Sequence, residues 1–257
     1  MEGADVAYVA ARVEWLAKAP GNSAGAAVTR IGGATVLRAT GVRSSMFNRV
    51  LLANDELVPR LDEAIDALGG PAPLRVDVLP PLPSSRLMGA LIRRGFACTG
   101  HFTALYGSAG ATDAARRFDG KVRQMREGEL DSWTDVYLRA FGIAGPDAEP
   151  MGSSLRALVG REASVMLVAE LDGRMAAITA LWIDGTTGYV ALCATLPDVQ
   201  GRGCQSALIR ACADISAERG CDLLAAHAAV GSQSQRNFEH AGMRIAFHKG
   251  IWTRPSR

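Results

Sequence analysis

The chain has 257 residues, with 28 Lys and Arg against 26 Asp and Glu and 48% hydrophobic residues. This composition supports an extensive core and excludes an intrinsically disordered protein, and the length suits one or two domains. The net charge of +2 argues against a dedicated nucleic-acid binder, which concentrates basic residues on one face. No apolar run approaches the length of about 20 residues that a membrane-spanning helix requires. From the charge we expect no nucleic-acid partner, and from the missing apolar run we expect no membrane partner.

The N-terminal segment and the cysteines narrow the class further. Residues 1–20 carry acids at Glu2 and Asp5 and charges throughout, which predicts an amphipathic helix rather than a signal peptide. The cysteines form no C-x-x-C pair and have no His-rich partner segment, which argues against a metal site or a disulfide framework. We expect free thiols in a cytoplasmic protein. The cysteines are Cys98, Cys193, Cys204, Cys212 and Cys221.

Hydrophobic alternation and glycine stops predict the elements of the first half in the order hairpin, strand, helix, strand, helix, strand. The hairpin turns at Gly32-Gly33, and Gly95 ends the second helix. The predicted ranges are 26–38, 46–53, 55–68, 74–79, 84–94 and 96–106.

The second half repeats this order. Its hairpin spans 164–171 and 174–183, and the elements that follow it span 188–195, 203–219, 222–229, 232–241 and 243–253. The halves agree best where a helix ends at a glycine and an apolar residue starts a strand, at Gly95-Phe96 and at Gly242-Met243. We interpret this as a two-copy duplication of an α/β unit with a mixed sheet; two unrelated units that share an order are the alternative. The polar stretch 108–119 is the candidate linker.

The chemistry of the sequence is concentrated in residues 197–208, which join an apolar strand to an amphipathic helix. Gly201 and Gly203 allow a tight turn and close approach of a ligand to the backbone. The first turn of the helix has free N–H groups, its dipole favours an anion, and Arg202 adds positive charge. The loop therefore predicts a phosphate or pyrophosphate site.

Two other phosphate loops are excluded by the residues themselves. A Walker loop requires a Lys after its glycines, and none is present. A dinucleotide fingerprint requires a third Gly where Ser206 stands, and an acid at the end of the next strand, which ends at His227-Ala228-Ala229.

The sequence resembles the GNAT superfamily of acyl-CoA N-acyltransferases. The pyrophosphate signature of that family is Gln or Arg, two variable residues, Gly, one variable residue, then Gly or Ala. Here it runs from Gln200 to Gln205, with Gly203 in place and Gln205 departing from Gly or Ala. The C-terminal family motif is matched by residues 237–243. The resemblance implies tandem GNAT-like halves: a degenerate domain over 1–110 that lacks the glycine loop, and an N-acetyltransferase domain over 120–257.

The resemblance also implies how acetyl-CoA binds. Pantetheine enters a gap beside the strand 188–195 and pairs with its backbone, and the thioester oxygen meets an amide near Leu192 or Cys193. Pyrophosphate lies on the amides of the glycine loop. The residues expected to bind this cofactor are Leu192, Cys193, Ala194, Thr195, Gln200, Gly201, Arg202, Gly203, Cys204, Gln205, Ser206 and Asn237.

The catalytic acid and base are not identified by the motif. Many family members use a Tyr on the last helix as the acid, but Phe238 stands there and cannot donate a proton. Because a thiolate leaves readily, a base that deprotonates the amine matters more. The candidate catalytic residues are His227, Tyr189 and Cys193, with Glu239 and His240 as further possibilities. Asn48 and Arg49 are candidate substrate contacts from the first half.

These observations predict an N-acetyltransferase that moves an acetyl or other acyl group from acetyl-CoA to a primary amine. The expected acceptor is a small molecule or a peptide amine, and the protein is expected to be a monomer or a homodimer. An acyl-CoA-binding sensor or pseudoenzyme without turnover is the first alternative. A structural dimerisation module without affinity for CoA is the second.

Overall fold

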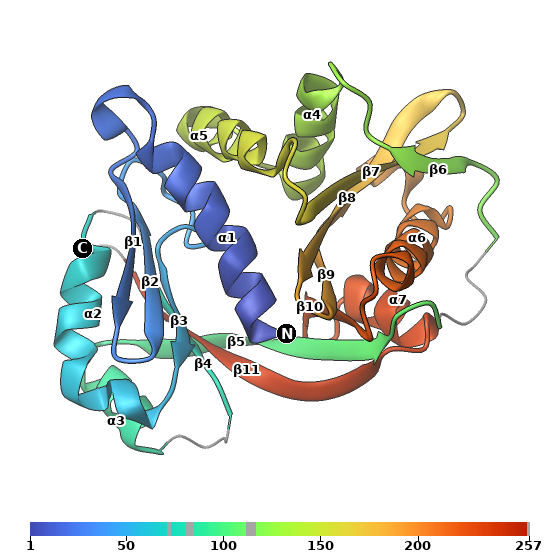
Figure 1. Cartoon of the computed structure of the whole chain (residues 1–257). Coiled ribbons are helices and arrows are strands. Elements are labelled where there is room, and N and C mark those ends of the chain that lie inside the picture. The colour runs from blue at the N-terminus through green and yellow to red at the C-terminus, as the bar shows by residue number, and fades with distance from the viewer. Residues whose placement is uncertain (71–72, 81–84, 112–116, 256–257) are drawn as a thin grey trace.

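The computed structural model describes residues 1–70, 73–80, 85–111 and 117–255 (Figure 1). Within them, eleven strands form one mixed sheet in the order β1-β2-β3-β4-β11-β5-β10-β9-β8-β7-β6. The predicted α/β class with a mixed sheet is therefore confirmed. The strands are β1 (Ala26–Ile31), β2 (Ala34–Ala39), β3 (Arg49–Ala53), β4 (Leu74–Val78), β5 (Ala97–Ser108), β6 (Lys121–Gln124), β7 (Ser164–Leu171), β8 (Arg174–Asp184), β9 (Thr187–Thr195), β10 (Leu223–Ala229) and β11 (Arg244–Arg254).

The helices lie on both faces of this sheet. Short 3₁₀ turns at 20–22, 55–60, 145–147, 154–158 and 197–199 lead into or follow them. Among the described residues, none of the helices has the length and apolar character that crossing a bilayer requires. The α-helices are α1 (Glu2–Ala17), α2 (Leu61–Leu68), α3 (Ser85–Arg93), α4 (Leu130–Phe141), α5 (Ala148–Ser153), α6 (Cys204–Glu218) and α7 (Gln233–His240).

Two long strands, β11 and β5, lie in the middle of the sheet and join its two parts, which are β1–β4 on one side and β6–β10 on the other, in the order β10-β9-β8-β7-β6. They run antiparallel to each other along the base of the molecule in Figure 1. β5 comes from the N-terminal half but pairs with β10, whereas β11 comes from the C-terminal half but pairs with β4. The last strand of each half thus lies beside the strands of the other half, and the halves share one sheet.

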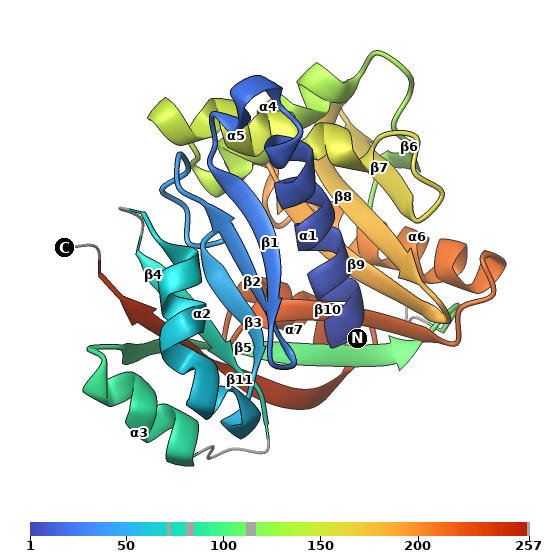
Figure 2. The same cartoon turned by 60° about the vertical axis from the view of Figure 1, so that its left-hand side comes forward.

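The N-terminal helix lies between the two parts of the sheet. In Figures 1 and 2, α1 crosses the space between the β1–β4 group and the β7–β9 group, and it contacts β1, β2, β8 and β9. Its apolar side chains Val6, Val9 and Val13 belong to one core with residues of both groups. This placement brings the N-terminus of α1 into the interior of the molecule, where Glu2 contacts His227 of β10.

A fully buried arginine fixes α1 against the 3₁₀ turn at 154–158. Arg12 donates hydrogen bonds to the Tyr8 and Tyr137 hydroxyls, at 3.0 and 3.3 Å, and to the Ser154 hydroxyl at 2.8 Å. Its guanidinium also lies 5.0 Å from the centre of the Phe47 ring. Aromatic rings and hydroxyls therefore take the place that a carboxylate usually holds beside a buried arginine.

The structure corrects several predicted boundaries. The strand expected over 46–53 begins only at Arg49, because the Asn48 side chain bonds the backbone at Ala39, Val42 and Ser44. The helix expected over 55–68 starts as a 3₁₀ turn, because Pro59 has no N–H for an α-helical bond. β6, α4 and α5 were not predicted. Ser84 and residues 112–116 of the predicted linker lie outside the described residues.

Candidate functional site

A cavity of about 610 Å³ opens where β9, the first turn of α6, α7 and the end of α4 meet. All the residues predicted to bind the cofactor line it except Leu192 and Arg202. The structure thus gathers the strand, the glycine loop and the last helix around one space. The predicted residues among its walls are Cys193, Ala194, Thr195, Gln200, Gly201, Gly203, Cys204, Gln205, Ser206 and Asn237.

The two parallel strands beside this cavity separate partway along their length. In the described residues, β9 pairs with β10 from Thr187 and Leu223 to Val190 and Ala226, and the pairing then ends. A register shift against β8 marks the same point and leaves Ala191 as a bulge. The remaining residues of β9 therefore have backbone groups without a strand partner on the β10 side.

The pairing with β8 identifies these groups. The Leu196 amide donates to the Ala176 carbonyl at 3.0 Å. Because hydrogen-bonded pairs alternate along an antiparallel ladder, Leu192 turns its backbone groups toward β8, whereas Cys193 and Thr195 turn theirs toward the gap. An extended ligand in the gap would find its hydrogen-bonding partners at Cys193 and Thr195.

The loop before α6 presents free amides to the cavity. Gly201 and Gly203 both have left-handed backbones, with φ of 80° and 82°. Gly203 is the N-cap of α6 and offers no side chain to the helix, whose first turn then has amides without intrahelical partners at residues 204–206. These amides and the positive end of the helix dipole favour an anion.

Besides its left-handed backbone, Gly203 lies close to another segment of the chain. A Cβ at this position would lie 2.6 Å from the Arg117 carbonyl oxygen, so the close approach is to the chain itself. A Cβ at Gly201 would meet nothing within 4 Å. Arg202 does not line the cavity; its guanidinium pairs with Asp172 at 2.5 Å, in the turn between β7 and β8.

Gln205, which departs from the family signature, joins two helices at the cavity. Its side chain donates to the Ser234 hydroxyl at 2.8 Å and accepts from the Asn237 amide at 2.7 Å. The Gln233 side chain in turn donates to Asn237 at 2.8 Å. The larger side chain at position 205 therefore connects α6 to α7, and Asn237 holds the helices together at the cavity wall.

The cavity walls carry no thiolate at neutral pH. Burial raises the pKa of the Cys193 thiol to about 12, despite nearby hydrogen-bonding groups on Thr179 and Gln205. Burial also raises the pKa of Cys204. Cys193 therefore contributes a neutral thiol and a backbone amide to this space rather than a nucleophile.

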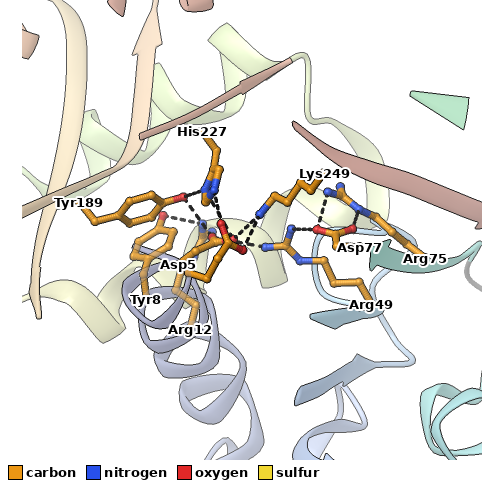
Figure 3. A network of polar contacts seen from close by, with 10 residues as sticks. Asp5, Tyr8, Arg12, Arg49, Arg75, Asp77, Tyr189, His227 and Lys249 are labelled. Carbon is orange, nitrogen blue, oxygen red and sulfur yellow. Dashed lines mark hydrogen bonds and ion pairs between the residues drawn. The ribbon is translucent and has the colours of Figure 1, made fainter. Parts of the chain in front are cut away.

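The other two candidate catalytic residues lie together in a buried polar network (Figure 3). The Tyr189 hydroxyl is 2.9 Å from His227 Nδ1 and 3.1 Å from Asp5 Oδ1, and His227 Nε2 is 2.5 Å from Glu2 Oε1. Both ring nitrogens of His227 are thus engaged. Burial, with Asp5 and Glu2 nearby, raises the pKa of Tyr189 well above its usual value, so its hydroxyl stays neutral.

Lys249 completes the network from β11. Its ammonium group lies 3.1 Å from Asp5 Oδ2 and 3.3 Å from Glu2 Oε2, and its side chain is 2% exposed. Burial alone would raise the pKa of Asp5, but Lys249, Arg49 and His227 outweigh it and hold that pKa below its usual range. Burial alone would lower the pKa of Lys249, but the neighbouring carboxylates raise it. Both groups are therefore ionised in the folded chain.

His227 and Tyr189 are not among the residues that line the cavity, and the remaining candidates do not line it either. Asn48 is fully buried and its amide holds the backbone. Arg49 pairs with Asp77 at 3.1 Å and lies 3.8 Å from Asp5, at the edge of the polar network. Phe238 is 2% exposed and belongs to the core. Glu239 and His240 are exposed on α7.

Sequence reasoning missed two groups of residues here. Ala140 and Phe141 of α4 line the cavity, and the spacing of Trp133, Tyr137 and Phe141 was a helical signal for α4. Glu2, Asp5 and Lys249 belong to the polar network, and a lysine within the predicted last strand was the available sign. Their meeting could not be read from the sequence, since Glu2 and Lys249 are 247 positions apart.

The comparisons with known proteins agree with this geometry. Residues 124–243 match the model of the Acetyltransferase (GNAT) family. A search of curated proteins gave no match. A functionally unknown conserved protein from Staphylococcus epidermidis has a similar fold, with a TM-score of 0.65, 12% identity and coverage of 89% of this chain and 93% of that one.

Two further solved structures with a similar fold are described as GCN5-related N-acetyltransferases. A GCN5-related N-acetyltransferase from Kribbella flavida gives a TM-score of 0.60 at 16% identity and covers 96% of both chains. One from Sphaerobacter thermophilus gives a TM-score of 0.62 at 16% identity and covers 78% of this chain and 68% of that one. These likenesses show the fold, and the family match supports acyl transfer as the general reaction class.

Proposed function

We propose that the chain is an N-acetyltransferase that moves an acetyl group from acetyl-CoA to a primary amine. One observation carries the proposal: the gap between β9 and β10 and the free amides of α6 open into the same cavity of about 610 Å³. An extended ligand with an anionic group fits both features. Acetyl-CoA has this form, with a pantetheine arm and a pyrophosphate.

The chain's own residues supply binding and orientation. The amides at the start of α6 hold the pyrophosphate, and the Cys193 and Thr195 backbone groups pair with the pantetheine in the manner of an added strand. The Cys193 N–H is the candidate donor to the thioester oxygen, where such a donor contributes about 10²–10³ in rate. Asn237 and Gln205 hold α7 at the edge of this space.

The reaction balances without a redox partner. The amine nitrogen bonds to the acetyl carbon, the carbon–sulfur bond breaks, and the thiolate leaves with the electron pair; the amine loses one proton and the thiolate takes one up. His227 and Tyr189 are the proposed route for the proton. Since Glu2 and Tyr189 engage both nitrogens of His227, this route requires one of these bonds to exchange during turnover.

We further propose that the N-terminal half is a degenerate copy of the C-terminal one. The order of hairpin, strand, helix, strand, helix and strand occurs in both halves, and each half extends its last strand into the other. In the N-terminal half, β3 and β4 pair again at their last residues, Ala53 and Val78, after a register shift that follows Val50. Within the described residues, these two strands are paired at the end where β9 and β10 are separate, which supports the proposal that this half binds no pantetheine arm.

Acetyl-CoA binding and turnover test the proposal separately. Acetyl-CoA at 100 times its Kd should stabilise the chain by about 2.7 kcal/mol, which a thermal shift detects. A panel of primary amines, with thiol release as the readout, should then give turnover with at least one acceptor. Binding without turnover on any amine would favour the sensor or pseudoenzyme, and no binding would favour the dimerisation module.

A further inference from the structure

A second cavity of about 400 Å³ lies on the other side of Phe141. Phe141 lines both cavities, so the second one adjoins the proposed cofactor site at the end of α4. Its walls come from α4, from the segment 142–147 between α4 and α5, from Met151 of α5 and from the loop before β3. A cavity of this volume is in the range that small organic ligands occupy.

Most side chains in the walls of this second cavity are aliphatic or aromatic, and the polar ones among them include Ser44 and Asp147. Met46, Tyr137, Phe141, Ile143 and Met151 supply aromatic and thioether surface. Phe141 is 48% exposed, which leaves a large apolar area for a ligand to cover. An aromatic or aliphatic body is the ligand group that such walls favour.

Asp147 is the charged residue among those that line this cavity, and its carboxylate is half-buried. One of its oxygens accepts the Arg43 backbone N–H at 2.8 Å, and in the described part of the chain no hydrogen bond or ion pair reaches the other oxygen. The neighbouring Arg12 does not offset it in the cavity, because the Arg12 guanidinium is fully buried behind Tyr137 and bonded to the Tyr137 hydroxyl. A ligand in this cavity therefore meets one free negative charge.

We propose that this cavity binds the acceptor and selects an apolar diamine. This inference rests on the proposed function. The reacting amine reaches past Phe141 to the β9 wall of the first cavity, the apolar body covers Phe141 and Met46, and the second ammonium group meets Asp147. The N-terminal half contributes Ser44 and Met46, so both halves form the acceptor site.

Two matched probes test this selection: para-xylylenediamine and para-methylbenzylamine, which differ in one ammonium group. Calorimetry with the chain saturated by CoA measures their binding without turnover. We expect the diamine to bind about tenfold more tightly, the gain typical of one charge-assisted hydrogen bond at a half-buried carboxylate. Asp147→Asn should remove this difference and leave the monoamine unchanged, since Asn retains an oxygen for the Arg43 N–H.

Glu149→Gln is the matched control, because Glu149 is exposed and does not line the cavity. It should keep the tenfold difference. Met46→Trp should weaken both amines several-fold while the affinity for CoA stays the same, which tests the cavity without a change of charge.

Equal affinity of the two probes for the native chain, or an unchanged diamine affinity in Asp147→Asn, would overturn the inference. The turnover assay is a separate measurement. If no amine is acetylated although the diamine binds in the expected way, the proposed function fails and the binding site stands.

Discussion

Gly201 and Gly203 have the same backbone conformation but different surroundings, which separates ligand binding from stability. Gly201→Ala places a methyl group in open space at the cavity, so its stability cost is only the left-handed conformation, about 1–2 kcal/mol. The strained loop should shift its amides and weaken acetyl-CoA binding about tenfold. Urea unfolding and calorimetry measure the two effects.

Gly220→Ala is the control for this prediction. Gly220 also has a left-handed backbone, with φ of 76°, and open space where the new methyl group would lie, but it is at the far end of α6 from the cavity. It should lose the same stability and keep its affinity for acetyl-CoA. Gly203→Ala should be less stable than both, because its Cβ meets the Arg117 carbonyl at 2.6 Å.

The Cys193 thiol offers a second test at the residue scale. Because burial raises its pKa to about 12, Cys193 should react slowly with iodoacetamide at pH 8, whereas the exposed Cys98 should react first. Peptide mass spectrometry over a time course reports the order. Cys193→Ala should keep turnover within a few-fold, and rapid alkylation of Cys193 with loss of activity would contradict a neutral thiol.

At the scale of elements, the N-terminus of α1 is held by buried charges. Asp5→Asn removes the carboxylate that lies 3.1 Å from Lys249 and leaves that ammonium group in the core with less compensation. Breaking a buried pair in this way should lower the free energy of unfolding by about 3–5 kcal/mol. Urea unfolding measures it, and Asp66→Asn, an exposed acid on α2, should change stability by less than about 0.5 kcal/mol.

The same network predicts how stability depends on pH. The pKa values of Asp5 and Asp77 are lowered in the fold, so the stability they contribute is present above their unfolded pKa of about 3.9 and is lost as the pH falls below it. The pKa of Lys249 is raised, so its contribution is present below about 10.4 and is lost as the pH rises further.

Thermal unfolding across pH should therefore show a plateau between about pH 5 and pH 9, with a fall on each side. The fall in stability on the acid side should be shallower in Asp5→Asn, since this variant lacks one of the carboxylates whose protonation causes the fall. An acid limb of unchanged slope in that variant would mean that Asp5 does not contribute to this fall.

At the scale of the whole molecule, the two halves are expected to differ in ligand binding. β3 and β4 pair again at Ala53 and Val78, beyond a register shift that follows Val50, whereas β9 and β10 separate after Val190 and Ala226. The turn before α2 contains no glycine. Calorimetry should therefore give one molecule of CoA per chain. Two equivalent sites would show that the N-terminal half retains a binding site of its own.

Much of the local structure was determined by the sequence alone. Glycines in the left-handed region end helices and open the loop at 201–203, and the apolar periods place most strands and helices close to their observed bounds. These signals act over a few residues, so they can be read without the fold. An anion-binding loop was predicted for this reason, and the resemblance to the GNAT superfamily implied its individual cofactor-binding residues. The structure places most of these residues around one cavity.

Only the tertiary structure decided how distant parts of the chain meet. β5 and β11 pair across the two halves, α1 brings Glu2 and Asp5 to His227 and Lys249, and Phe141 stands between two cavities. A buried carboxylate and a solvated one look the same in a sequence, because the difference lies in partners hundreds of positions away. The cost of burying charge without a partner is what makes these long-range contacts specific, and it acts only once the sheet has brought both halves together.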